Sequence, residues 1–194
     1  MANLNIEPVL VIGVNWTIQG VLGHGNSDQF TAAYEENGEV LNTMRSRPHF
    51  CSFYARGRMS NLRDSRGNNV HAFNYIVMSL VDRPLGDMER AGGHFKPGTS
   101  ISATKQMLDA LIALHSAGFA HCDLTAANTA IGYQTTERRR MFLIDFGSAL
   151  KIAQNPTTHK KDLMMWFELM AKMYAGRIPM EITAEFGTYV VYSP

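Results

Sequence analysis

Three polar residues in the middle of the sequence stand at spacings that could serve chemistry. Asp123 lies five positions before Asn128 in the segment HCDLTAAN, and Asp145 follows in LIDFG. Carboxylates accept protons, and carboxylate and amide oxygens bind hard cations. The alternative interpretation is structural, because an aspartate also caps loops and occupies turns at strand ends. Which interpretation holds depends on the elements around these residues.

The composition predicts a globular, intracellular protein. The 194 residues are 45% hydrophobic and 18% charged with a net charge of +1, so a core can form and neither nucleic acid nor a membrane surface is favoured as a partner. Two cysteines, Cys51 and Cys122, give no disulfide framework and indicate a reducing compartment. The sequence contains no CxxC or HExxH motif, so no metal site is predicted from cysteine and histidine spacing. The opening segment MANLNIEPVLVIGVNW has no basic region and is too short for a membrane span, so we expect neither a signal peptide nor an anchor.

The first 80 or so residues are predicted to be mostly β-structure. Short apolar runs between residues 8 and 47 are interrupted at Gly23, at Gly25 and at the segment EENG, which predicts three short strands. Further strands are expected on both sides of the polar loop NLRDSRGNN.

Two amphipathic helices are predicted farther along the chain. The first spans SATKQMLDALIALHSAG, with Thr99 or Ser100 as its cap and Gly118 as its end. The second spans KKDLMMWFELMAKMYAG and ends at Gly176. Between them MFLIDFGSAL predicts a short buried strand that enters a glycine turn, and the arginines of ERRR just before it are expected in a solvated loop rather than a phosphate-binding patch.

Several of these segments, in this order, resemble the protein-kinase signature set. GHGNSD (23–28) is similar to a glycine-rich loop, HCDLTAAN to a catalytic loop, and LIDFG to the D-F-G motif. Within the kinases the chain resembles the casein kinase 1 group, in particular its divergent nematode branch, over most of residues 10 to 180. The segments that carry this resemblance are YIVMSLVDRPLGDM, LHSAGFAHCDLTAANTAIG, MFLIDFGSALK and KKDLMMWFELMAKMYAGRIP.

The resemblance implies an α+β, bilobal, protein-kinase-like fold. Residues 1–81 would form a small β-rich N-lobe and the hinge, without a clear αC helix. Residues 82–194 would form a helical C-lobe with the catalytic loop, the D-F-G motif and an αF-like helix. The activation segment and the later helices of the family would be missing.

The resemblance also implies a site for ATP and magnesium, because phosphoryl transfer depends mainly on positioning the phosphates and metal ions. Asp123 would orient or deprotonate the acceptor hydroxyl, and Asn128 and Asp145 would bind magnesium. The nucleotide itself would contact Gly23 and Gly25 near the phosphates, the hinge residues Met78, Ser79 and Val81 at adenine, and Arg45 and Asp145.

Several positions depart from the family pattern. Kinases of this family carry a lysine on the third strand, paired with a helix glutamate, yet no lysine precedes Lys96. The best match to that lysine is Arg45 in TMR, ahead of Asn42, and a planar guanidinium does not replace an ammonium group. The other exchanges are Asp28 for the third loop glycine, Cys122 for the arginine of H-R-D, and Thr125 for a lysine.

Two intervals are also short. No glutamate lies between Glu39 and Glu89, and the chain that follows Arg45 is too short for the helix that carries the family's glutamate. Asp162, the matching helix aspartate, follows Asp145 by only 17 positions, which leaves little room for an activation segment.

Three hypotheses follow from this combination. The first is a pseudokinase that acts by binding a protein partner or a nucleotide. The second is a residual or atypical serine/threonine kinase that uses Asp123, Asn128 and Asp145 on a protein substrate. The third is that the deduced chain lacks coding segments, since both short intervals fall between well-matched blocks. All three place the protein inside the cell, in the cytoplasm or nucleus, with no nucleic acid or membrane as partner.

Overall fold

The computed structural model describes residues 11–12, 16–17, 30–59, 62–63, 69–70, 73–92 and 95–175. Its helices are α1 (Phe30–Thr43), α2 (Leu85–Gly92), α3 (Pro97–Ser116) and α4 (Thr158–Ala175), with a 3₁₀ turn, η2 (Thr135–Glu137). Its strands are β1 (Val11–Ile12), β2 (Trp16–Thr17), β3 (Phe53–Met59), β4 (Leu62–Arg63), β5 (Asn69–Val70), β6 (Phe73–Met78), β7 (Val81–Pro84), β8 (Phe119–Ala120), β9 (Thr129–Gly132), β10 (Met141–Leu143) and β11 (Leu150–Lys151). This order confirms the α+β fold class.

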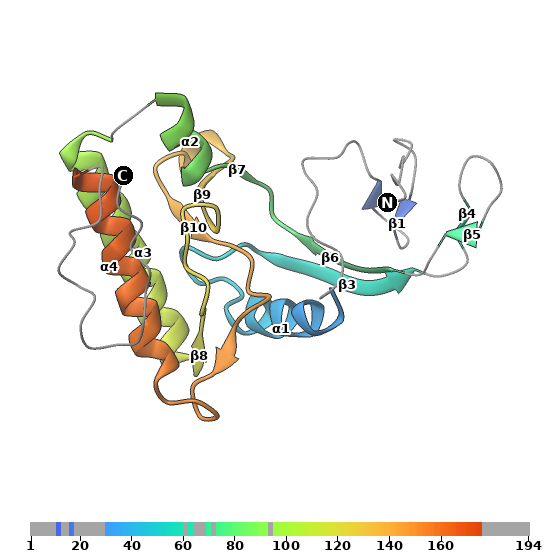
Figure 1. The fold of residues 1–194 in the computed structure, drawn as a ribbon. Coiled ribbons are helices and arrows are strands. Elements are labelled where there is room, and N and C mark those ends of the chain that lie inside the picture. The colour runs from blue at the N-terminus through green and yellow to red at the C-terminus, as the bar shows by residue number, and fades with distance from the viewer. Residues whose placement is uncertain are drawn as a thin grey trace.

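The first part of the described chain is built on the antiparallel pair of β3 and β6, with α1 packed against both strands (Figure 1). The pairing runs from Phe53 opposite Met78 to Met59 opposite Phe73. Gly57 lies directly against Tyr75, and a Cβ atom at Gly57 would come within 2.6 Å of the Tyr75 hydroxyl. The glycine is therefore required by the packing of this pair.

Helix α1 corrects the prediction for the N-terminal third. Three strands were expected between residues 8 and 47, but residues 30–43 are helical. The buried side chains of Val40, Leu41 and Met44 lie at spacings of one and four, which place them on one helix face. Gly38, expected to break the chain, lies inside the helix, where a Cβ atom would meet the Arg56 side chain at 2.6 Å. The Arg56 side chain thus lies against Gly38, a residue that the sequence pattern had placed in a turn.

The second part of the described chain rests on α3 and α4, which pack along each other (Figure 1). Gly118 ends the first of the predicted helices with a φ of 91°, which confirms that expectation, because this conformation costs glycine little. The start of the helix differs, since α3 begins at Pro97, whose fixed φ suits the first turn. Ser100 is not a cap but a buried residue whose hydroxyl donates to the Met173 carbonyl at 3.0 Å.

Two small sheets lie between these parts. β9 pairs antiparallel with β10 on one side and β7 on the other, and β8 pairs with β11. Ser79 and Leu80 connect β6 to β7. This connection joins the two parts (Figure 1). One buried cluster runs through the described chain from Val40 of α1 to Met173 of α4. Within the described ranges, no helix has the length and apolar character needed to cross a bilayer.

Candidate active site

A buried carboxylate on α4 fixes the segment between β8 and β9 by hydrogen bonds to its backbone. Asp162 on α4 is fully buried, and its two oxygens accept the backbone N–H groups of His121 and Cys122, each at 2.7 Å. The side chain of His115 on α3 bonds the same carboxylate at 2.8 Å. Cys122 has a φ of 65°, a conformation that non-glycine residues rarely adopt. These contacts fix the strained backbone just before Asp123.

His121 is buried and links this segment to the chain after β10. Its Nε2–H donates to the Ile144 carbonyl at 3.2 Å, while Nδ1 accepts the Asp123 N–H at 3.4 Å. Burial lowers the pKa of His121, and the attraction of the Asp162 carboxylate opposes that effect. A neutral imidazole suits these partners, because only the neutral ring has an accepting nitrogen. His121 therefore braces the segment.

Asp123 and Asn128 face each other across the same loop. The Asn128 side-chain amide donates to the Asp123 carboxylate at 2.8 Å and to the Asp123 carbonyl at 2.9 Å. The loop is closed at Thr125, whose carbonyl and hydroxyl both accept the Asn128 N–H. With its nitrogen occupied in this way, Asn128 keeps its side-chain oxygen for a cation. The predicted pair is thus brought together by the structure.

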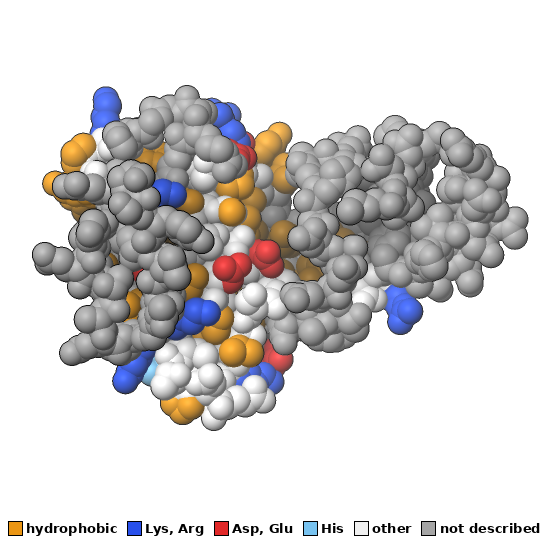
Figure 2. Space-filling view, viewed as in Figure 1, with side chains coloured by type: hydrophobic (Ala, Val, Ile, Leu, Met, Phe, Trp, Pro, Cys, Tyr) orange, Lys and Arg blue, Asp and Glu red, His pale blue; other side chains and the backbone are white. Residues whose placement is uncertain are grey.

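Asp145 follows β10 on a turn of its own. Its φ is 60°, its side chain is exposed, and its carboxylate accepts the Gly147 N–H at 3.2 Å. The neighbouring Ile144 N–H donates to the Asn128 carbonyl at 3.0 Å, which joins this turn to the loop of Asp123. Figure 2 shows acidic side chains exposed near the centre of one face. The chemistry of a carboxylate beside an amide oxygen fits magnesium.

Helix α1 reaches this turn through Asn37. The Asn37 side-chain oxygen accepts the Phe146 N–H at 2.7 Å, and the Phe146 ring is buried between Phe50 and His121. Two residues along α1, Glu39 pairs with Lys151 of β11 at 2.8 Å. Sequence analysis missed Asn37. The only signal was its place three and four positions before the buried Val40 and Leu41.

Comparison with known proteins decides the family. The family model described as "Protein kinase domain" matches residues 50–172, more than half of the chain. The chain belongs to the protein kinase family. The matched range contains Asp123, Asn128 and Asp145 together with the buried Asp162 beneath their loop.

Individual kinases are similar at low identity. A serine/threonine-protein kinase of Dictyostelium discoideum is 27% identical over 173 residues, which cover 77% of this chain and 33% of that protein. A Caenorhabditis elegans protein described as a casein kinase I is 26% identical over 171 residues, with 74% and 47% covered. Nucleosomal histone kinase 1 of Drosophila melanogaster is 37% identical over 82 residues, with 42% and 14% covered. The chain thus spans between a third and about half of the length of the first two relatives.

The assignment of Arg45 to the family's strand lysine is wrong. Arg45 lies in the turn after α1, with an exposed side chain, and not on a strand. A helix, α1, occupies the chain just before Arg45. The prediction that the N-lobe lacks a clear αC helix stays a prediction. A lysine of the family type would lie ahead of α1, where the sequence has neither lysine nor arginine.

The remaining predicted positions divide into two groups. Met78, Ser79 and Val81 lie where β6 passes into β7, with the Ser79 N–H bonded to the Ser52 carbonyl at 2.9 Å. The Ser79 carbonyl is therefore the group of that residue that an adenine amino group could meet. Gly23 and Gly25, with Asp28, lie outside the described residues. Their roles stay predictions.

The chain from Asp145 to α4 takes a short route. β11 pairs with β8, and a turn then leads into α4, where Thr157 N–H donates to the Asn155 side chain at 3.3 Å. Thr158, the first residue of α4, donates its hydroxyl to the Asn155 carbonyl at 2.8 Å. Between Asp145 and α4 the chain thus forms a short strand and a turn.

Proposed function

We propose that this chain is a casein-kinase-1-like protein kinase domain in which phosphoryl transfer is impaired and which acts by binding a protein partner or a nucleotide. The likeness to the casein kinase I relative of Caenorhabditis elegans supports this group. The two unpaired cysteines, Cys51 and Cys122, support a reducing, intracellular location in the cytoplasm or nucleus. A role in signalling follows from the family.

One observation supports the proposal that phosphoryl transfer is impaired. Among the α1 side chains that the structure describes, Asn37, a neutral amide, contacts the D-F-G turn, and no lysine or arginine lies ahead of α1 in the sequence. Kinases hold the α- and β-phosphates with a strand lysine that a helix glutamate orients. Without that cation the phosphates lose a main electrostatic contact, and transfer slows because it depends on positioning and charge.

The residues that remain could still position a nucleotide. ATP with magnesium would supply the phosphoryl group, and the Asp145 carboxylate and the Asn128 side-chain oxygen are hard donors of the kind magnesium prefers. Within the described part of the chain no three His, Cys, Asp or Glu residues gather into a metal site. Phosphate oxygens would therefore have to complete the coordination.

A second candidate function is a residual serine/threonine kinase. The hydrogen bond from the Asn128 amide to the Asp123 carboxylate at 2.8 Å favours it, because it holds that carboxylate in place. Asp123 would then accept the proton of a substrate hydroxyl. The short chain between Asp145 and α4 offers a protein substrate little docking surface, which disfavours this candidate.

Two measurements test the proposal. In a thermal-shift titration, ATP is expected to raise the melting temperature only with magnesium, and Asp145→Ala should abolish the shift. Asp109→Ala on the exposed side of α3 is the matched control and should leave the shift unchanged. Transfer of radiolabelled phosphate to casein that disappears in Asp123→Asn would contradict the impaired-kinase proposal and establish the second candidate.

A further inference from the structure

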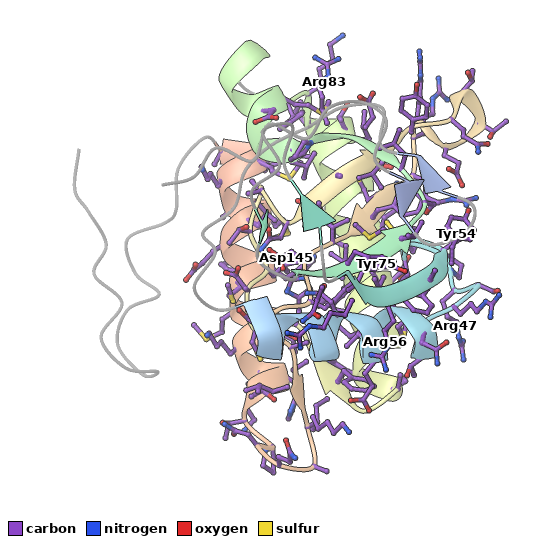
Figure 3. The ribbon with its side chains drawn as sticks, turned by 90° about the vertical axis from the view of Figure 1, so that its right-hand side faces the viewer. Arg47, Tyr54, Arg56, Tyr75, Arg83 and Asp145 are labelled. Atoms are coloured by element: carbon purple, nitrogen blue, oxygen red, sulfur yellow. The ribbon has the colours of Figure 1, made fainter. Side chains whose placement is uncertain are left out.

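A polar cavity lies apart from the site described above. Its volume is about 290 Å³, and it opens to solvent between the turn after α1, the start of β3 and the chain between β9 and β10. Arg47, Tyr54, Ser79 and Arg140 are among its lining residues, whereas Asp123, Asn128 and Asp145 are not. In Figure 3 Arg47 and Tyr54 lie at one edge of the molecule, well apart from Asp145.

One wall of the cavity is a strained turn that carries Arg47. Ser46 and His49 have φ values of 67° and 71°, although neither is a glycine. Such conformations persist where surrounding contacts impose them, and they are concentrated at ligand-binding turns and active sites. The contacts here come from β10. The His49 ring donates its Nδ1–H to the Met141 carbonyl at 2.8 Å, and the His49 backbone carbonyl accepts the Leu143 N–H at 3.0 Å.

The opposite wall is the arginine run before β10. Gln106 of α3 fixes this segment at two points, because its amide donates to the Arg139 carbonyl and accepts the Met141 N–H, both at 3.0 Å. Arg140 lines the cavity and is paired with Glu137 at 3.3 Å on an exposed surface. Sequence analysis expected these arginines in a solvated loop, yet Arg140 faces the same cavity as Arg47.

The cavity presents more positive than negative charge. The exposed Arg47 guanidinium makes no hydrogen bond or ion pair with any residue that the structure describes, and Glu137 is the only acidic residue among those lining the cavity in that part of the chain. Ser46 and Ser52 add hydroxyl groups to the lining. Arginine binds phosphate through two parallel N–H donors, and arginine clusters with hydroxyl donors are the usual way to recognise phosphorylated side chains.

We propose that this cavity binds a phosphate monoester, with Arg47 and Arg140 as its cationic contacts. The cavity lies at the lower end of the size range of small-molecule sites, which suits one phosphorylated side chain or one free phosphate ion. Because one wall precedes β3 and the other precedes β10, the bound group would connect two segments that are distant in the sequence. Ser79 of the cavity lining also belongs to the predicted hinge, so occupancy would reach the chain next to the nucleotide site.

Calorimetric titration of the full chain without nucleotide tests this proposal. The probes are a short peptide with one phosphoserine, the same peptide without phosphate, and inorganic phosphate. We expect saturable binding of the phosphopeptide, of inorganic phosphate, or of both, and none of the unphosphorylated peptide. If the phosphopeptide binds more tightly than inorganic phosphate, the ligand is a phosphorylated protein side chain. If the phosphopeptide and inorganic phosphate bind equally well, the ligand is the free anion.

Variants connect the binding to the cavity. Arg47→Gln should weaken binding by about tenfold or more, because a charge-assisted contact is lost, whereas Arg47→Lys should weaken it less. Arg83→Gln is the matched control, since Arg83 is exposed on β7 and lies well apart from Arg47 (Figure 3). Melting temperatures of all variants should match the parent, as these side chains are exposed. Equal binding of both peptides, or an Arg47→Gln variant that binds like the parent, would overturn the proposal.

Discussion

At the scale of single residues, His121 and Asp162 determine the shape of the catalytic loop. Asp162 accepts two backbone N–H groups from the loop, and His121 bonds the Ile144 carbonyl next to the D-F-G motif. Both side chains are fully buried, so each unmet partner would cost a desolvation penalty. The loop is therefore held in place whether or not the chain transfers phosphate.

The burial of His121 predicts how stability depends on pH. Burial lowers the pKa of His121 in the folded chain, whereas the unfolded chain protonates this ring near its ordinary value of about 6.5. Below that pH the unfolded state binds more protons, so stability falls as the pH decreases. His121→Phe keeps a ring beside Phe146 and removes this titration. Its melting temperature should fall less steeply than the parent's between about pH 7 and pH 5, and equal slopes would contradict the assignment.

At the scale of elements, α1 connects the N-terminal part to the D-F-G segment. Asn37 accepts the Phe146 N–H, and Glu39 pairs with Lys151 two residues along the same helix. The helix lies ahead of Arg45, and therefore ahead of the first of the two short intervals seen in the sequence.

The two contacts of α1 should differ in strength. Asn37→Ala leaves the Phe146 N–H without its partner in a part-buried position and should lower the free energy of unfolding by about 1–3 kcal/mol. Glu39→Gln removes an ion pair whose two side chains are both about half exposed, and should cost about 0.5 kcal/mol or less. Urea unfolding of both variants measures the difference. A loss at Glu39 as large as that at Asn37 would show that the ion pair holds the helix.

At the scale of the whole molecule, one buried cluster joins α1, the β3–β6 pair, the small sheet of β7, β9 and β10, and the helices α3 and α4. Cys51, just before β3, belongs to this core and is 1% exposed. Burial raises the pKa of its thiol, with the Ser79 hydrogen bond acting in the opposite direction. Because thiols react as thiolates, Cys51 is shielded both by packing and by its protonation.

Thiol labelling should therefore report global unfolding. In a Cys122→Ser variant, Cys51 should react slowly in buffer and rapidly across the urea range in which the fold is lost. In a Cys51→Ser variant, the part-exposed Cys122 should react faster in buffer than Cys51 does in the Cys122→Ser variant. This holds even though burial and the charge of Asp162 raise the pKa of Cys122. Rapid labelling of Cys51 without urea would contradict the single core.

Prediction from the sequence was most successful where the signal was local. The helical spacing before Gly118 predicted α3, and the separation of Asp123 from Asn128 predicted a pair that the structure brings into contact. It was least successful before residue 44, where Gly38 was taken for a turn residue. In the structure Gly38 lies inside α1 against the Arg56 side chain, 18 positions away, and no local pattern indicates that contact.

By itself the sequence indicated the protein kinase family and showed that no lysine precedes Lys96, because residue identity and short spacing carry that information. Tertiary structure alone decided that Asn37 meets Phe146 across 109 positions, that Arg45 lies in a turn, and that Arg47 and Arg140 line one cavity. Contacts between such distant residues depend on how every helix and strand packs in the common core. No local pattern encodes that packing.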